Sequence, residues 1–224
     1  MAAIGDHKDQ HLRAIAMTLK ALVFAALSLV LPTSAMAAEW TYTDGSGQTV
    51  TLDHVPTRIV AHANAAAGLI PLGIRPVGIY ADSPVDAAKA LEGLDLTGIE
   101  IIGQAWGEVD VEKAAALEPD LVLAEWWDRN STWSGGEDVV ATLSQLAPIT
   151  GVSAGDSIVG MIEDYETLAQ SLGAELSAPA IAENKAAFET ALADFKTAIE
   201  AKRGLTAHAV DSGDATIYVA DPAC

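Results

Sequence analysis

The sequence feature that most constrains the fold is an alternation of short apolar segments with helical ones between residues 58 and 152. Five short segments rich in Ile, Val, Leu and Ala predict buried strands, at residues 58–61, 76–80, 100–103, 120–124 and 148–152. Helices are predicted between them, at residues 64–72, 111–117 and 138–146. Short strands that alternate with helices are typical of a parallel sheet covered on both faces. The predicted fold class is therefore α/β, with a Rossmann-like parallel-sheet N-terminal lobe.

Local signals set the ends of several elements. Asp110 is placed to cap the second helix at its N-terminus, and Gly73 to adopt the left-handed conformation after the first. Pro71 lies inside the first helical segment, so we expect that helix to be kinked or short. Before the lobe, residues 40–52 alternate around a turn at residues 44–47, which predicts a β-hairpin.

The pattern changes after residue 155. Residues 158–172 carry apolar side chains at helical spacing, and a second amphipathic helix runs from Pro179 to Arg203. That helix, of about 25 residues and roughly 37 Å, is long enough to connect two lobes. A new strand begins at residues 216–220, and the sequence ends four residues later. We therefore expect a second lobe that is essentially missing from this chain.

The N-terminal segment has the pattern of a cleavable export signal. Lys20 precedes an apolar run at residues 21–31, Pro32 interrupts it, and Ala35-Met36-Ala37 is a small-x-small cleavage pattern. The alternative is a membrane anchor, but a run of eleven residues is too short to cross a hydrocarbon layer of roughly 30 Å. The only cysteine is Cys224, so neither a lipid anchor after the cleavage site nor a disulfide within the monomer is expected.

These patterns divide the chain into four parts. We predict a signal peptide at residues 1–37 with cleavage near Ala37, an N-terminal ligand-binding lobe at 38–155, a helical linker with the long interlobe helix at 156–205, and the start of a C-terminal lobe at 206–224. The predicted location is the periplasm.

Charge and missing motifs exclude several classes of function. The formal net charge is −19, and a chain this acidic repels the phosphates of nucleic acids, so we expect no nucleic-acid partner and a monomeric protein. Phosphate-binding glycine motifs, a nucleophile elbow and the H-E-x-x-H zinc motif are all missing from the sequence. The chain is therefore predicted not to be an enzyme, with an enzyme on a Rossmann-like sheet as the rival interpretation.

Candidate ligand-binding residues follow the predicted strands at their carboxyl ends, where open parallel sheets bind ligands. Four tryptophans lie within 28 residues on these loops. Such a group suggests a surface for a large, partly aromatic ligand, although tryptophans can also simply cover the end of a sheet. The predicted ligand-binding residues are His62, Tyr80, Trp106, Glu125, Trp126 and Trp127.

His62 admits two interpretations. It could bind a metal ion together with Asp82, Glu125 or Asp128, or it could be a polar residue hydrogen-bonded at a helix start. No tight ligand spacing supports the first interpretation, so no metal site is predicted.

Two segments resemble a known family. Residues 49–60, continued by residues 72–79, are similar to the start of the periplasmic binding proteins for siderophores, haem and vitamin B12. Residues 106–122, in which Pro119-Asp120 precede an apolar strand, are similar to the second block of that family. The loop at residues 105–109 and the segment at residues 78–84 look closest to the siderophore-type branch.

The resemblance implies two lobes joined by a rigid helix, with a ligand captured between them and delivered to an inner-membrane ABC permease. It implies that Trp106 contacts the ligand and that Glu112 docks onto arginines of the permease. Glu112 has a simpler alternative, as a first-turn glutamate favoured by the helix dipole. The missing second lobe would supply half of the cleft.

The predicted function is capture of a ferric siderophore or similar iron chelate, with no cofactor and with iron only as part of the bound chelate. The alternatives are a haem, vitamin B12 or metal-ion binding protein of the same transport class. Tyr80 could ligate haem iron, or it could serve packing. A fragment that binds nothing is the remaining possibility.

Overall fold

The computed structural model describes residues 39–128, 131–132, 134–153, 157–200, 202, 204, 210–212 and 217–219. The predicted signal peptide at residues 1–37 and Trp133 lie outside the described residues, as does the side chain of Trp127. Among the described residues, no helix has both the length and the apolar character needed to cross a membrane.

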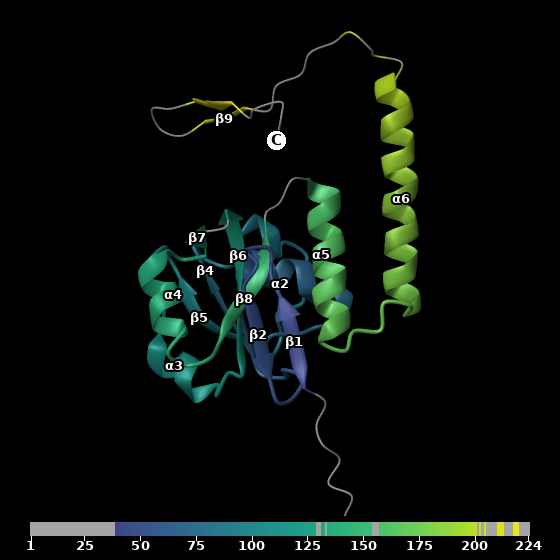
Figure 1. Cartoon of the computed structure of the whole chain (residues 1–224). Helices are drawn as coiled ribbons and strands as arrows, with labels where there is room; N and C mark the ends of the chain where they lie inside the picture. Colours follow the sequence, from purple (N-terminus) through teal and green to yellow (C-terminus); the bar gives the residue numbers. More distant parts are fainter. Residues whose placement is uncertain are drawn as a thin grey trace, which may run out of the picture. The chain divides into compact units, whose positions relative to one another are not determined.

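A parallel sheet forms the centre of the lobe (Figure 1). Its strands are β3 (Ile59–His62), β4 (Gly78–Ala81), β5 (Glu100–Gln104), β6 (Leu121–Asp128) and β8 (Ile149–Ser153). They lie in the order β5-β4-β3-β6-β8, and every pairing among them is parallel. All five strands match the predicted segments within a few residues, and the Rossmann-like α/β prediction is confirmed.

A short strand, β7 (Ser131–Thr132), adds an antiparallel pairing at the end of β6. Trp126 pairs with Thr132 of β7 and with Ser153 of β8, so these two strands flank opposite edges of β6. Strand β3 pairs with the first part of β6, and β7 pairs with the last part of β6 along the same edge, beyond the end of β3.

Helices cover both faces of the sheet (Figure 1). On one face pack α2 (Ala63–Leu69) and α5 (Ile158–Ser171), and on the other α3 (Val111–Ala116) and α4 (Glu137–Leu143). Along β3, Ile59 and Ala61 belong to the core on the α2–α5 face, whereas Val60 belongs to the core on the α3–α4 face. Both sides of each central strand are thus buried, which explains why the strands read as continuous apolar runs.

The predicted local signals occur in the structure. Helix α2 ends at Leu69, and the chain continues as the 3-10 helix η1 (Ile70–Leu72), because Pro71 cannot donate a helical hydrogen bond. Gly73 has a φ of 88°, and the Asp110 side chain accepts the N–H of Lys113. The hairpin consists of β1 (Trp40–Thr43) and β2 (Thr49–Leu52), and a further 3-10 helix, η2 (Lys89–Leu91), follows β4.

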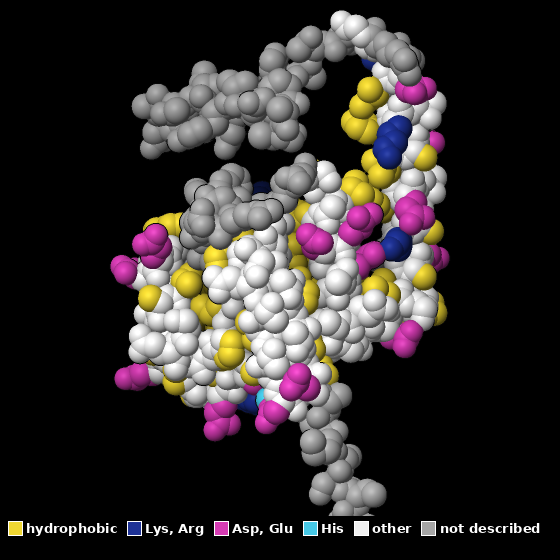
Figure 2. All heavy atoms as spheres, viewed as in Figure 1, with side chains coloured by type: hydrophobic (Ala, Val, Ile, Leu, Met, Phe, Trp, Pro, Cys, Tyr) yellow, Lys and Arg dark blue, Asp and Glu magenta, His cyan; other side chains and the backbone are white. Residues whose placement is uncertain are grey.

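Beyond the lobe, α6 (Pro179–Glu200) is the long helix, with 22 residues. None of its residues is buried, and Phe195 and Ile199 are 60% and 51% exposed. Figure 2 shows hydrophobic side chains along this helix, and Asp and Glu side chains at scattered places on the visible face. Strands β9 (Val210–Ser212) and β10 (Ile217–Val219) pair antiparallel. The sequence analysis predicted β10 but missed β9.

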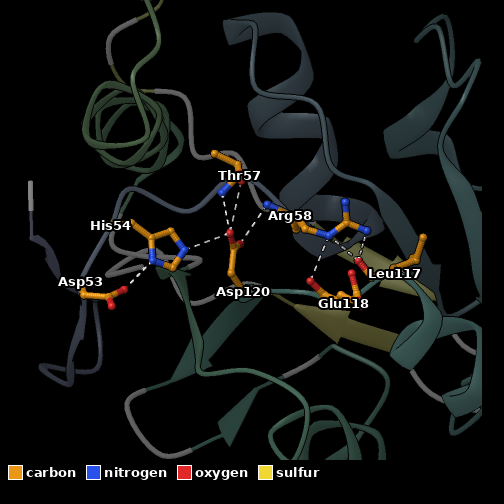
Figure 3. A network of polar contacts seen from close by, with 7 residues as sticks. All are labelled: Asp53, His54, Thr57, Arg58, Leu117, Glu118 and Asp120. Atoms are coloured by element: carbon orange, nitrogen blue, oxygen red, sulfur yellow. Dashed lines mark hydrogen bonds and ion pairs between the residues drawn. The ribbon is translucent and has the colours of Figure 1, made fainter. Parts of the chain in front are cut away.

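A polar network joins the starts of β3 and β6 at the amino edge of the sheet (Figure 3). Asp120 accepts the backbone N–H groups of Thr57 at 2.8 Å and Arg58 at 2.9 Å. The Arg58 guanidinium donates in turn to the carbonyl oxygens of Leu117 and Glu118. His54 lies between two carboxylates, 2.6 Å from Asp53 and 3.3 Å from Asp120. The Pro119-Asp120 motif thus has a structural role, at the edge opposite the predicted ligand-binding residues.

Candidate functional site

The candidate site is the carboxyl edge of the parallel sheet, where β3, β4 and β6 end side by side. His62 ends β3 and lies in register with Tyr80 of β4. Asp82 follows β4, and Glu125 and Trp126 lie in the last part of β6. The topology therefore brings together four of the predicted ligand-binding residues: His62, Tyr80, Glu125 and Trp126.

His62 caps helix α2 and is only 2% exposed. Its Nδ1 accepts the backbone N–H of Asn64 at 3.4 Å, so neutral His62 carries its proton on Nε2. That Nε2 lies 3.3 Å from Oδ2 of Asp82, without the alignment of a hydrogen bond. Binding a metal through Nε2 would require the proton to move to Nδ1 and would break the cap. The described residues contain no group of three or more potential metal-ligating His, Cys, Asp or Glu side chains.

Tyr80 lies beneath the edge and is 1% exposed. Its ring packs edge-on against His62, with ring centroids 5.2 Å apart and an interplanar angle of 64°. Burial raises the pKa of the Tyr80 phenol well above its ordinary value. Tyr80 therefore supports His62 from within the core on the α3–α4 face.

Glu125 is held by two neighbours. Its Oε2 accepts the side-chain N–H of Asn64 at 2.7 Å, and its backbone N–H donates to Oγ of Ser134 at 2.9 Å. Tyr165 of α5 lies close by, and burial together with the charge of Glu125 raises the pKa of its phenol. Trp126, the next residue along β6, is partly buried.

Trp106 extends from the loop after β5 and is 53% exposed, the largest exposure that the structure records for a tryptophan side chain among the described residues. Gly136 lies against it, since a Cβ there would come within 3.3 Å of the Trp106 ring. Glu112 is exposed in the first turn of α3. The Trp106 and Trp126 indoles are thus neither buried core residues nor spread over the amino edge.

Buried polar atoms without a hydrogen-bond partner concentrate at this edge. Among the described residues they are His62 Nε2, Tyr80 Oη, Asp82 Oδ1, Trp126 Nε1 and Tyr165 Oη, although the Ser134 side chain lies near Tyr80 Oη and lowers the Tyr80 pKa against the larger effect of burial. Buried polar atoms in proteins are nearly always hydrogen-bonded, so each exception calls for an explanation. Four of the five belong to residues at the ends of β3, β4 and β6, and the fifth belongs to the neighbour of Glu125. Unpaired donors and acceptors therefore gather at the carboxyl edge, although none of these atoms is itself exposed.

The sequence analysis missed three members of the site. Asn64 orients Glu125, Ser134 binds the backbone of β6, and Tyr165 approaches from α5. Asn64 could have been found, because it directly follows a strand end. Tyr165 could not, since its spacing in α5 is that of an ordinary core residue.

Comparison with known proteins gives matches among solved structures. No family model and no curated protein matches the sequence. The chain is similar to DesE, a ferric-siderophore receptor protein from Streptomyces coelicolor, with a TM-score of 0.71, 30% identity, and coverage of 80% of this chain and 62% of DesE.

Two further structures share the fold. A TroA-like periplasmic binding protein from Xylanimonas cellulosilytica has a TM-score of 0.54 and 25% identity, covering 83% of this chain and 60% of that one. PiuA, an iron uptake ABC transporter substrate-binding protein from Streptococcus pneumoniae, has a TM-score of 0.55 and 24% identity, covering 78% and 58%. The chain spans about three fifths of the length of these proteins. In fold, and in sequence at 30% identity to DesE, this chain is similar to substrate-binding proteins of this class over about three fifths of their length.

Proposed function

We propose that this chain captures a ferric siderophore or similar iron chelate for an ABC importer, at the carboxyl edge of its parallel sheet. The observation that carries the proposal is the concentration of unpartnered buried polar atoms at that edge, beside the half-exposed Trp106. The similarity to DesE, a ferric-siderophore receptor protein, and to PiuA, an iron uptake substrate-binding protein, supports the same class of ligand. The proposed role is binding, without catalysis.

Trp106 and Trp126 supply the aromatic surface in this proposal. Indole rings contact a large chelate over a wide area and lose little conformational entropy on binding. Trp127, which follows Trp126, is proposed as a third contact. Glu125 and His62 offer polar contacts, and Tyr80 supports His62 from below.

Delivery and location are parts of the same proposal. Glu112 is exposed in the first turn of α3, where a carboxylate is free to pair with arginines of a permease. Export by a signal peptide cleaved near Ala37 would place the protein in the periplasm, in keeping with the periplasmic relative from Xylanimonas.

The proposal is tested by isothermal titration calorimetry of the protein from residue 38 to residue 224. The probes are ferric hydroxamate, catecholate and carboxylate chelates, together with haem, cobalamin, Zn²⁺ and Mn²⁺ as rivals. We expect saturable binding of at least one ferric chelate and none of the free metal ions. Binding of Zn²⁺ or Mn²⁺ alone at one ion per chain would instead identify a metal-ion binding protein.

A further inference from the structure

A small cavity opens at the carboxyl ends of β3 and β4. Its volume is about 250 Å³, and its lining includes His62, Asn64, Asp82, Ser83 and the segment 87–90. Pockets that enclose a whole drug-sized ligand measure roughly 300–1,000 Å³. This cavity therefore has room for one arm of a chelate, while the iron centre stays outside it.

Asp82 is the unsatisfied acceptor of the cavity. Its Oδ1 is buried and has no hydrogen-bond partner, although the side chain as a whole is 27% exposed. A buried carboxylate oxygen without a donor is costly, so it favours a ligand that brings an N–H group or a positive charge. A carboxylate or phenolate arm on the ligand would be repelled at the same position.

His62 lies beside this carboxylate. Because Nδ1 of His62 accepts the N–H of Asn64, its proton is on Nε2, which lies 3.3 Å from Oδ2 of Asp82 without forming a hydrogen bond. The imidazole is thus next to one carboxylate oxygen, and Oδ1 has no hydrogen-bond partner. The same tautomer makes Nε2 a donor and not a metal ligand.

The cationic residue in the cavity lining does not neutralise Asp82. The Lys89 ammonium pairs with Glu92 at 3.1 Å, and its side chain is 88% exposed. Among the described residues, no lysine or arginine side chain forms an ion pair with Asp82.

We propose that Asp82 binds a protonated amine on one arm of the ferric chelate, so that the site selects chelates that carry a cationic arm. This proposal rests on the proposed function. The ammonium donates to the partly exposed carboxylate of Asp82, which has no hydrogen bond from His62. Charge-assisted hydrogen bonds of this kind are among the stronger polar contacts in proteins.

The test compares two probes that differ only in that charge: ferric desferrioxamine B, which carries a terminal ammonium, and its N-acetylated form, which is neutral. By calorimetry, we expect the wild-type chain to bind the amine form about tenfold more tightly, as one charge-assisted hydrogen bond would give. Asp82→Asn keeps the shape of the side chain and should abolish the preference, leaving the affinity for the acetylated form unchanged. Asp86→Asn, the same charge change at an exposed position nearby, should retain the preference.

Each other outcome is decisive. Equal affinity of the wild type for the two probes, or a preference that survives Asp82→Asn, overturns the role of Asp82 and leaves the proposed function standing. Tight binding of an anionic tris-catecholate chelate, with neither desferrioxamine probe bound, overturns the selection for a cationic arm. Failure of all ferric chelates to bind contradicts the proposed function as well.

Discussion

Asp120 and Arg58 form two hydrogen bonds with each other at the amino edge of the sheet, and both involve backbone atoms of Arg58. The carboxylate of Asp120 accepts the N–H of Arg58 at 2.9 Å, and the N–H of Asp120 donates to the carbonyl of Arg58 at 3.0 Å. The guanidinium of Arg58 then reaches the carbonyl of Glu118, which holds the left-handed φ of 46° at that residue. The contact fixes the start of β6 beside the start of β3 (Figure 3).

Replacing Asp120 by Ala should destabilise the lobe by roughly 2–4 kcal/mol, because two backbone N–H groups lose a charged acceptor. Thermal and urea unfolding followed by circular dichroism measure the change. Glu183→Ala, on the exposed surface of α6, removes the same charge and should leave stability within about 0.5 kcal/mol of the wild type. Equal effects of the two variants would show that the network contributes nothing.

His54 should make stability depend on pH. Its hydrogen bonds to Asp53 and then Asp120 raise its pKa above the ordinary 6.5, so the folded state binds the proton more tightly than the unfolded state. The contribution is fully present below about pH 6.5 and is lost as pH rises through the folded-state pKa. The wild type should therefore have a higher Tm than His54→Asn at about pH 6, and this difference should vanish by about pH 9. A difference that grows toward alkaline pH would contradict this assignment.

Gly68 allows α2 and α5 to approach closely. A Cβ at Gly68 would lie 2.6 Å from the Tyr165 ring, closer than real side chains come. Gly68→Ala should therefore cost about 1–3 kcal/mol by overpacking, despite the better helix propensity of alanine. Gly160→Ala, where the nearest atom is Ser157 Oγ at 3.2 Å, is the matched control in α5. Unfolding of the two variants in urea compares them, and a stabilised Gly68→Ala protein would disprove the close contact.

Trp106 should matter for ligand binding but not for folding. Because its side chain is 53% exposed, Trp106→Ala should leave the Tm almost unchanged. If it stacks on the chelate, the variant should lose about tenfold or more in affinity by calorimetry. Trp40→Ala is the contrasting variant, since Trp40 is 3% exposed and donates to Ser171 at 3.2 Å. It should lower the Tm, and wild-type affinity of Trp106→Ala would remove this residue from the site.

Glu112→Gln should separate capture from delivery. The variant should bind the chelate as the wild type does, while uptake of radioactive iron by cells that depend on this protein falls. Glu183→Gln, at an exposed glutamate of α6, should leave uptake unchanged. Uptake that is the same for both variants would assign Glu112 to the helix dipole alone.

The sequence by itself determined the five strands of the parallel sheet and most helix ends, because these depend on local signals and on burial of both strand faces. The run at residues 58–61, the cap at Asp110 and the left-handed Gly73 are examples. It also predicted which strand ends carry ligand-type side chains, since strand ends in a parallel sheet share one edge.

Only the tertiary structure decided how those side chains are used. Asn64 and Glu125 lie 61 positions apart in the sequence yet form a hydrogen bond of 2.7 Å. The hydrogen bond that Asn64 N–H donates to Nδ1 sets the His62 tautomer, and burial makes Tyr80 a support within the core instead of an exposed ligand contact. Strands β7 and β9 were missed because two or three residues carry too little periodicity to be recognised without their pairing partners. Hydrogen-bond partners and burial depend on distances between segments remote in sequence, and no local pattern encodes such distances.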